Sequence, residues 1–392
     1  MHFSIYLIKF VLLLFCFSIF CGCKTELEEY PVGIAAPGGR TNYAILKEAG
    51  FSHLRVNDAS IENLDAAYAM GMKIISSPGL YAKKDFDKEL VYKKTKYTDH
   101  HPALYAWYLA DEPELKKTDP FYVKELNQYL KLKGIKKPTA LVMFKGYEAH
   151  DYANIPDILV SDRYPIGWQP VESFAMHFRM IRYAAGENKK VFAMIQAFDW
   201  RYHPTVWDGD DPRPPTLDEL RNMTWTALAL GADGIFYYAY DDGKWKMSEH
   251  LETWDALRTV VAEIRTYEPL FKAERAYCDA KIEYVDINDA YNAVWDPSVI
   301  LKKVIVKKGN QNIKPGEYIL CVNTAKKSIK CKILFPELYS RNIYYFNISN
   351  NEKGLLKIKN GWGITCLEPY QIIFFCSSKS KDSTTIPGIV VE

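Results

Sequence analysis

The stretch Ala103-Leu-Tyr-Ala-Trp-Tyr-Leu-Ala-Asp-Glu-Pro-Glu114 joins an uncharged, aromatic-rich run to an abrupt acidic end. Residues 104–110 carry no charge and show no clean alternation, which is typical of a strand buried on both faces in a parallel sheet. Pro113 restricts the preceding residue to an extended backbone and can open a helix. Asp111 and Glu112 are therefore expected at the carboxyl end of a strand, where (β/α)8 barrels place their reactive groups.

Similar apolar runs recur along the chain from residue 31, with helical stretches between them. Together with 104–110, eight strands are predicted, the others being 31–36, 53–57, 73–77, 139–144, 158–161, 191–196 and 234–239. The expected helices are 42–49, 61–70, 121–132, 173–185, 217–230 and 254–267. Eight strand–helix units predict a TIM barrel over residues 30–270.

A doubly wound open sheet is the competing architecture. Such a sheet more often carries a glycine-rich phosphate turn after its first strand. Here Pro37-Gly-Gly-Arg40 follows that strand without forming GxGxxG, so a simple turn is expected. The lysine-rich segment 83–96 is predicted to be a solvated loop.

The sequence changes character after the barrel, and residues 275–378 are predicted to form an antiparallel β-sandwich. Its short β-like runs are 282–287, 300–306, 318–322, 329–335, 343–348 and 371–375. Residues 379–392 are polar in their first part and are expected to be a flexible tail.

The composition limits the classes of partner. Of 392 residues, 48% are hydrophobic, which suffices for a packed core. A net charge of +2, from 50 basic and 48 acidic residues, gives no reason to expect a nucleic-acid partner. The 28 Tyr and 9 Trp suit a protein that stacks flat ligands such as sugar rings, although ordinary core packing explains many of them.

The N-terminus reads as a targeting segment. Lys9 precedes an apolar run, residues 10–20, that resembles a secretory signal and is short for a membrane span. Phe20-Cys-Gly-Cys23 resembles a bacterial lipobox. This resemblance implies that residues 1–23 are a signal and that Cys23 is the lipidated first residue of an exported lipoprotein, periplasmic or on the cell surface. A plain cleaved signal or a short anchor is the alternative.

The cysteines and histidines suggest no metal site. Three of the eight cysteines lie within the first 23 residues, and the other five lie past residue 270. No CxxC or Cys/His spacing is present, and the histidines show no ligand spacing. No metal and no other cofactor is expected.

If the barrel closes, the strand ends bring their polar residues to one rim. The catalytic candidates are Asp111, Glu112, Asp162 and Asp199. The candidates for substrate binding are Arg55, Asn57, Lys145, Tyr164, Gln196, Trp200, Tyr238, Tyr240 and Asp241. Structural roles compete with these, such as helix capping for Asp111 and an internal ion pair for Asp162.

The segment Tyr108-Leu-Ala-Asp-Glu-Pro113 resembles the acid/base motif that closes the fourth strand of clan A glycoside hydrolases. A barrel followed by a small β-sandwich, with Gly361-Trp-Gly-Ile364 and Leu367-Glu-Pro-Tyr370 near its end, is also similar to that group. The resemblance implies hydrolysis of an extracytoplasmic poly- or oligosaccharide. Glu112 would be the general acid/base, with a pKa raised by burial or by Asp111.

The chain departs from that pattern on strand seven. Retaining members carry a nucleophilic Glu there, whereas this sequence reads Ile195-Gln-Ala-Phe-Asp199. Three outcomes remain open. The second carboxylate is Asp199, Asp162 or Asp241; or Asp111 and Glu112 form an adjacent pair similar to that of substrate-assisted hexosaminidases, including some β-N-acetylgalactosaminidases; or the barrel is a degenerate, non-catalytic carbohydrate-binding one.

Overall fold

The computed structural model describes residues 29–78, 82–205, 209, 211–295, 298–336 and 342–376. The predicted signal segment, Cys23 and the predicted tail lie outside these ranges. The chain from Pro31 onward belongs to one compact unit. Within the described ranges, no helix combines the length and the apolar character needed to cross a membrane.

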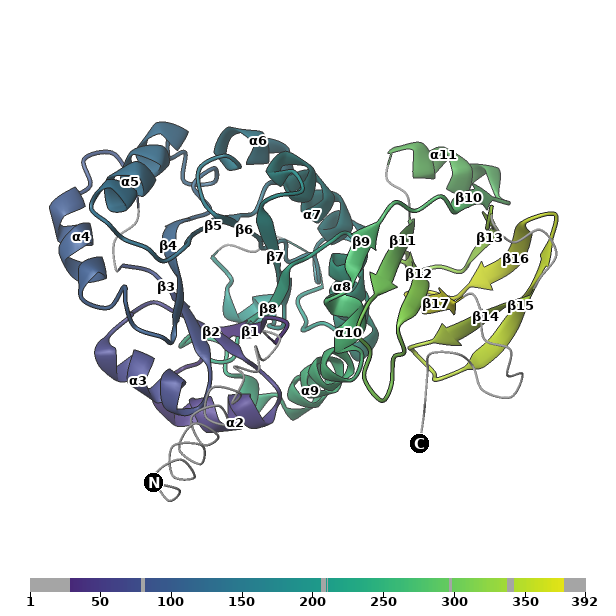
Figure 1. Ribbon diagram of the computed structural model, residues 1–392, viewed down its shortest axis with the longest axis horizontal. Helices are drawn as coiled ribbons and strands as arrows, with labels where there is room; N and C mark the ends of the chain where they lie inside the picture. The colour runs from purple at the N-terminus through teal and green to yellow at the C-terminus, as the bar shows by residue number, and fades with distance from the viewer. Residues whose placement is uncertain are drawn as a thin grey trace, which may run out of the picture. The chain divides into compact units, whose positions relative to one another are not determined.

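Eight parallel strands form a closed barrel in chain order, with β1 paired to β8 (Figure 1). They are β1 (Val32–Ala35), β2 (His53–Val56), β3 (Lys73–Ser76), β4 (Leu104–Asp111), β5 (Thr139–Met143), β6 (Ile158–Ser161), β7 (Lys190–Gln196) and β8 (Gly234–Tyr238). The predicted TIM barrel is confirmed, and closure excludes the open sheet.

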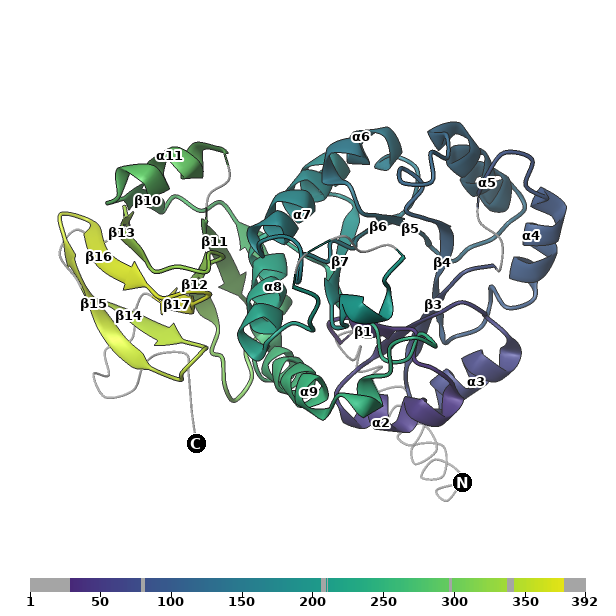
Figure 2. The same cartoon turned by 180° about the vertical axis from the view of Figure 1, so that it is seen from behind.

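Helices surround the barrel, as both cartoons show (Figures 1 and 2). They are α2 (Tyr43–Glu48), α3 (Ile61–Ala69), α4 (Lys88–Lys96), α5 (Pro120–Leu132), α6 (Ala149–Tyr152), α7 (Glu172–Ala185), α8 (Leu217–Ala229), α9 (Leu251–Thr266) and α10 (Glu268–Phe271). Short 3-10 turns are η1 (Arg40–Asn42), η2 (Gly146–Glu148), η3 (Trp200–Tyr202) and η4 (Met247–Glu249).

Helix α4 corrects the loop predicted for residues 83–96. The Asp87 carboxylate accepts a hydrogen bond from the Leu90 backbone N–H at 2.9 Å and caps the helix. Val91 and Thr95 lie four residues apart and are both buried, so they form an inward face. The lysines lie around this narrow stripe, which is why the segment resembles a solvated loop in sequence.

Aromatic side chains fill the barrel near the amino ends of its strands. His53 meets the rings of Tyr105 and Phe236 edge-on, with centroids 4.9 and 6.1 Å apart. Phe192 stacks on Phe236 at 5.6 Å. Burial, with nearby Arg and Lys charges, lowers the pKa of His53 to about 3, so its imidazole is neutral. This layer closes one end of the barrel and leaves the carboxyl end for a cavity.

The C-terminal part is an antiparallel sheet of nine strands folded into a sandwich, in the order β10-β13-β16-β15-β14-β17-β12-β11-β9. They are β9 (Glu274–Ala276), β10 (Lys281–Tyr284), β11 (Val299–Val306), β12 (Gly316–Asn323), β13 (Ile329–Leu334), β14 (Asn342–Asn347), β15 (Lys353–Lys359), β16 (Trp362–Leu367) and β17 (Ile372–Cys376). The predicted antiparallel sandwich is confirmed. Strand β15 joins its halves by pairing with both β14 and β16.

Within the C-terminal part, three strands and one helix were not predicted from the sequence. Strands β9 and β15 lie largely at the surface and carry charged residues, and only two of the six residues of β16 are buried. Ile287, predicted to end a strand, instead begins helix α11 (Ile287–Trp295).

Helix α8 is buried along most of its length because it also contacts the sandwich. The Trp225 ring packs against Phe271 and Phe374, with centroids 4.9 and 5.1 Å apart. Asn222 Nδ2 donates to the backbone oxygens of Asn323, at 2.8 Å, and Tyr370, at 3.2 Å. An apolar contact and two buried hydrogen bonds thus join α8 to the sandwich.

We expect Gly33→Ala to lower the free energy of unfolding by about 1 to 3 kcal/mol, the usual cost of overpacking. A Cβ at this position would lie 2.2 Å from the Phe236 ring. Chemical denaturation measures the loss, and Gly33→Ala/Phe236→Leu tests its cause. The double variant should lose less than the sum of the single variants, since the smaller side chain makes room. An additive loss would contradict the proposed clash.

Candidate active site

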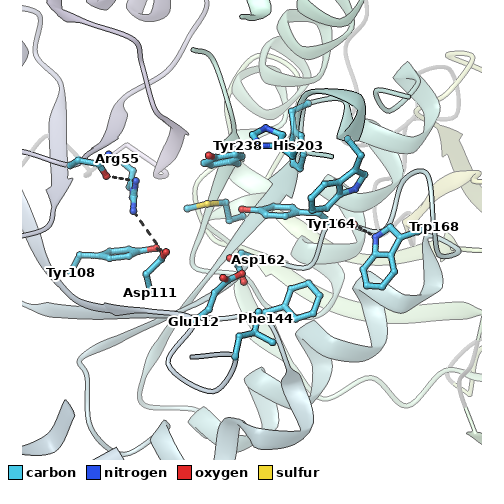
Figure 3. A pocket seen from close by; sticks show the side chains of 15 residues that line it. Arg55, Tyr108, Asp111, Glu112, Phe144, Asp162, Tyr164, Trp168, His203 and Tyr238 are labelled. Carbon is cyan, nitrogen blue, oxygen red and sulfur yellow. Dashed lines mark hydrogen bonds and ion pairs between the residues drawn. The ribbon is translucent and has the colours of Figure 1, made fainter. Parts of the chain in front are cut away.

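A cavity of about 670 Å³ lies at the carboxyl ends of the barrel strands (Figure 3). This volume falls in the range typical of small-ligand sites. Its lining residues are Arg55, Asn57, Tyr108, Asp111, Glu112, Leu115, Phe144, Asp162, Tyr164, Trp168, Met194, Phe198, Trp200, His203 and Tyr238. Among the described residues, carboxylates from β4 and from just after β6 therefore share one hollow with aromatic side chains.

The backbone of Glu112 is not extended, so the conformation predicted for the residue before Pro113 is wrong. The φ of Glu112 is +46°, in the left-handed region that residues other than glycine rarely adopt, and its N–H donates to the Val142 carbonyl at 3.1 Å. Consecutive residues of a regular strand point to opposite faces. At Glu112 the chain leaves that geometry, and both Asp111 and Glu112 line the cavity. The local conformation thus places two adjacent carboxylates in one site.

The carboxyl groups of Glu112 and Asp162 lie side by side in Figure 3 and interact directly. Asp162 is only 5% exposed. Burial, then the negative charge of Asp111, raises the pKa of Glu112, and burial with the charge of Glu112 raises the pKa of Asp162. Because two ionised carboxylates repel each other in such a buried place, the contact favours a proton held by the pair.

Asp111 is held differently from its neighbour. Its Oδ1 lies 3.8 Å from an Arg55 guanidinium nitrogen and accepts the Tyr108 hydroxyl at 3.4 Å. Its Oδ2 lies 3.1 Å from the Lys116 ammonium, and a third of the side chain is exposed. Two cationic side chains thus pair with this carboxylate. The site therefore combines a proton-sharing pair with an ion-paired carboxylate.

Glu114 fixes the neighbouring strand end. Its Oε1 accepts the backbone N–H groups of Phe144, at 2.6 Å, and Lys145, at 2.9 Å. Burial raises the pKa of this carboxyl, and the backbone hydrogen bonds oppose that effect. Sequence reasoning assigned Glu114 no role, although it belongs to the same acidic run. Its contacts tie the segment after β4 to the end of β5.

A second polar group lies at the end of β8. Asp242 Oδ2 accepts the Tyr238 hydroxyl at 3.1 Å and lies 3.1 Å from His203 Nε2. Its Oδ1 accepts the N–H groups of Lys244, at 2.9 Å, and Trp245, at 2.8 Å. Although burial opposes ionisation, these contacts lower the pKa of Asp242 to about 2. Asp242 is thus an anion that orients two cavity-lining side chains.

Aromatic rings form the rest of the wall. Phe144 and Trp168 are nearly parallel, at 10°, with centroids 6.2 Å apart. The Arg163 guanidinium lies 4.3 Å from the first ring centroid and 4.6 Å from the second. Tyr164 stacks on Tyr238 at 5.8 Å (Figure 3). Such amphipathic rings provide flat surfaces on which a sugar can stack.

Two predicted residues from strand seven do not reach the cavity. The Gln196 amide is fully buried: its oxygen accepts the Ile166 N–H at 2.8 Å, and its nitrogen donates to the Ile166 and Phe198 carbonyls. Asp199 is also fully buried and accepts the Arg201 backbone N–H, at 2.8 Å, and its Nε, at 2.7 Å. Neither side chain lines the cavity, because these polar groups satisfy the loop that follows β7.

Three other predicted residues point elsewhere. Lys145 pairs with Glu148 at 3.0 Å, and Tyr240 packs edge-on against Trp254 at 5.4 Å. Asp241 accepts the N–H of the glycine two residues later and borders a separate hollow. None of the three lines the Glu112 cavity. Strand β8 ends at residue 238, so the alternation that grouped Tyr240 with Tyr238 no longer applies.

The remaining predicted residues are brought together in the cavity. They are Arg55, Asn57, Asp111, Glu112, Asp162, Tyr164, Trp200 and Tyr238. The lining residues Tyr108, Phe144, Trp168, Phe198 and His203 were not expected there. An aromatic residue within two positions of a strand end is a sequence signal that could have identified Phe144 and Phe198.

The described residues contain no cluster of three or more His, Cys, Asp or Glu side chains arranged to hold a metal ion.

The fold and cavity define a class: a (β/α)8 barrel with a carboxylate site at its carboxyl rim and a C-terminal β-sandwich. No family model matches the chain, and no curated protein matches it by sequence. Solved structures that it resembles are glycoside hydrolases with this barrel.

Three of these structures illustrate the likeness. One described as a glycoside hydrolase has a TM-score of 0.59 at 10% identity, over 90% of this chain and 93% of its own. A GH42 β-galactosidase from Geobacillus stearothermophilus has a TM-score of 0.56 at 8% identity, and the match covers 89% of this chain and 98% of that one. A GH27 β-L-arabinopyranosidase from the same organism has a TM-score of 0.55 at 11% identity, and the match covers 91% of this chain and 98% of that one. At such identities the likeness establishes the fold alone.

Asp162→Asn is expected to raise the free energy of unfolding at pH 7 by on the order of 1 kcal/mol. A carboxyl with a raised native pKa binds its proton more tightly when folded. Such a carboxyl does not change the free energy of unfolding below the pKa that it has in the unfolded chain. As the pH rises from that value to the raised native pKa, the free energy of unfolding falls, and above the native pKa the loss is constant. The amide removes this cost.

Denaturation at pH 4 and pH 7 measures the effect, and the gain should shrink at the lower pH. Asp151→Asn, at an exposed carboxylate 3.3 Å from the His150 ring, is the matched control and should show no comparable gain. A lower stability of Asp162→Asn at pH 7 would contradict a proton-sharing pair.

Proposed function

We propose that this protein hydrolyses glycosidic bonds, with Glu112 as the proton donor. The observation that carries the proposal is the close pair of Glu112 and Asp162 carboxyl groups, with raised pKa values, inside a cavity walled by aromatic rings. A general acid needs a pKa near the working pH and access to the substrate. The glycosidase fold of the structural neighbours supports the same substrate class, a poly- or oligosaccharide.

The role of Glu112 follows from its surroundings. Burial and the Asp111 charge raise its pKa, and the contact with Asp162 keeps a proton within reach. When a glycosidic oxygen approaches, Glu112 donates this proton to the leaving group. Asp162, being deeper, is a proton partner for Glu112.

The second carboxylate is best assigned to Asp111. Glycosidases place their two reacting carboxyls about 5 to 9.5 Å apart, so that a sugar carbon or a water fits between them. Asp162 touches Glu112 and leaves no such space, while Asp199 and Asp241 lie outside the cavity. Asp111 is ion-paired, partly exposed and faces the same hollow. It can activate a water molecule or orient a substituent of the sugar.

Glu112→Gln is expected to lower kcat/KM for oligosaccharides by about 10² to 10⁴-fold, the usual contribution of general acid catalysis. The loss should be much smaller for 2,4-dinitrophenyl glycosides, because that leaving group departs without a proton. Asp111→Asn should slow both substrate types. The measurement is initial-rate kinetics on panels of aryl glycosides and oligosaccharides.

Glu148→Gln is the matched control, since Glu148 pairs with Lys145 and does not line the cavity. It should leave the rates unchanged. If the unaltered protein turns over no glycoside but still binds glycans, the hydrolase assignment is wrong. A non-catalytic carbohydrate-binding protein on a degenerate barrel then replaces it.

We also propose that the protein is exported and anchored to a membrane through Cys23. The lipobox-like segment Phe20-Cys-Gly-Cys23 supports this proposal. The segment lies outside the described residues. Cells expressing the full chain and fed radiolabelled palmitate should label it, and Cys23→Ala should abolish labelling and release the protein from membranes. Cys21→Ala is the control and should retain the label. Equal labelling of the unaltered chain and Cys23→Ala would refute the anchor site.

A further inference from the structure

A second cavity, of about 460 Å³, lies beside the first, at the carboxyl ends of β1, β2 and β8. Arg55, Asn57 and Tyr238 line both cavities, so the two hollows adjoin along these side chains. Each volume lies in the range of small-ligand sites. A ligand held against Glu112 can therefore extend past Arg55 into the second hollow.

Glycines leave the floor of the second cavity open. Gly38 has φ +78°, and a Cβ there would lie 2.6 Å from that of Asp241, so only glycine fits. A Cβ on Gly39 would meet nothing nearer than 3.9 Å, and one on Gly243 nothing within 4 Å. The backbone therefore lies exposed beside the hollow, where its polar groups are accessible to a ligand.

The walls offer oxygen and amide groups of the kind that bind sugar hydroxyls. Asp58 is exposed at one edge, and Asp241 lies at the other. Asn63, on the first turn of α3, donates to the Asp58 carbonyl at 3.1 Å. Arg55 is the cationic lining residue, and it donates to Asn57 and faces Asp111. The carboxylates outnumber the cation, which disfavours an anionic ligand.

We propose that the second cavity is a sugar-binding subsite, continuous with the Glu112 cavity, that takes a neutral sugar unit. This inference rests on the proposed function for the identity of the ligand. The substrate then contains at least two sugar units, one at Glu112 and the next across Arg55. Uronic or sulfated sugars are poor ligands for the second unit, because Asp58 and Asp241 repel them.

The test measures binding, so that it does not depend on turnover. Isothermal titration calorimetry of the Glu112→Gln protein uses neutral gluco-, galacto-, manno- and xylo-oligosaccharides of one to six units, with oligogalacturonates as the anionic series. For at least one neutral series, affinity should rise by tenfold or more from one unit to two or three. The anionic series should bind at least tenfold more weakly.

Asn63→Trp, added to Glu112→Gln, fills the second cavity from the surface of α3 and should abolish the gain in affinity with length. Glu62→Trp is the matched control: Glu62 is the adjacent exposed residue of the same helix and does not line the cavity, so the gain should persist. Asp58→Trp, on the exposed edge, provides a second blocking variant if Asn63→Trp fails to fold.

The subsite is refuted if affinity does not rise with length in any series, or if both blocking variants keep the gain. Equal binding of oligogalacturonates refutes its preference for a neutral sugar. A failure of the proposed hydrolase activity gives a different result. The protein with Glu112 intact would then release no product from the same oligosaccharides, while the affinity of the Glu112→Gln protein would still rise with their length.

Discussion

The arrangement of the site depends on one contact, that between the carboxyl groups of Glu112 and Asp162. These residues follow different strands, β4 and β6, and meet because the closed barrel brings all carboxyl strand ends to one rim. Contact between two buried acids raises the pKa of both. Barrel closure thus brings together two acidic groups that are distant in the sequence.

The surrounding structure keeps this contact in place at some cost in stability. The left-handed backbone at Glu112 is unfavourable, yet it turns Glu112 into the cavity beside Asp111. Glu114 fixes the end of β5 through two backbone N–H groups. Below them, the aromatic layer around Phe236 fills the barrel and gives the cavity a packed floor. Strain and buried charge at the rim are therefore offset by packing elsewhere.

Acidic and amide residues at the rim divide into two groups by burial and by partner. Gln196 and Asp199 are fully buried, and their polar atoms are used by backbone groups and by Arg201. They shape the loop that carries Trp200 and His203 into the cavity. Asp111 and Glu112 instead keep polar atoms directed at the hollow. Residue type alone does not separate structural from ligand-facing groups, because the separation depends on the path of each loop.

The sequence alone determined the strands of the barrel and the placement of Asp111 and Glu112 at a strand end, because apolar runs act locally on burial and backbone conformation. Only the tertiary structure decided that Asp162, rather than Asp199 or Asp241, meets Glu112. It also decided that Gln196 points into a loop and that β15 joins the two halves of the sandwich. Such contacts depend on barrel closure and loop paths between residues distant in the chain, which no local pattern encodes.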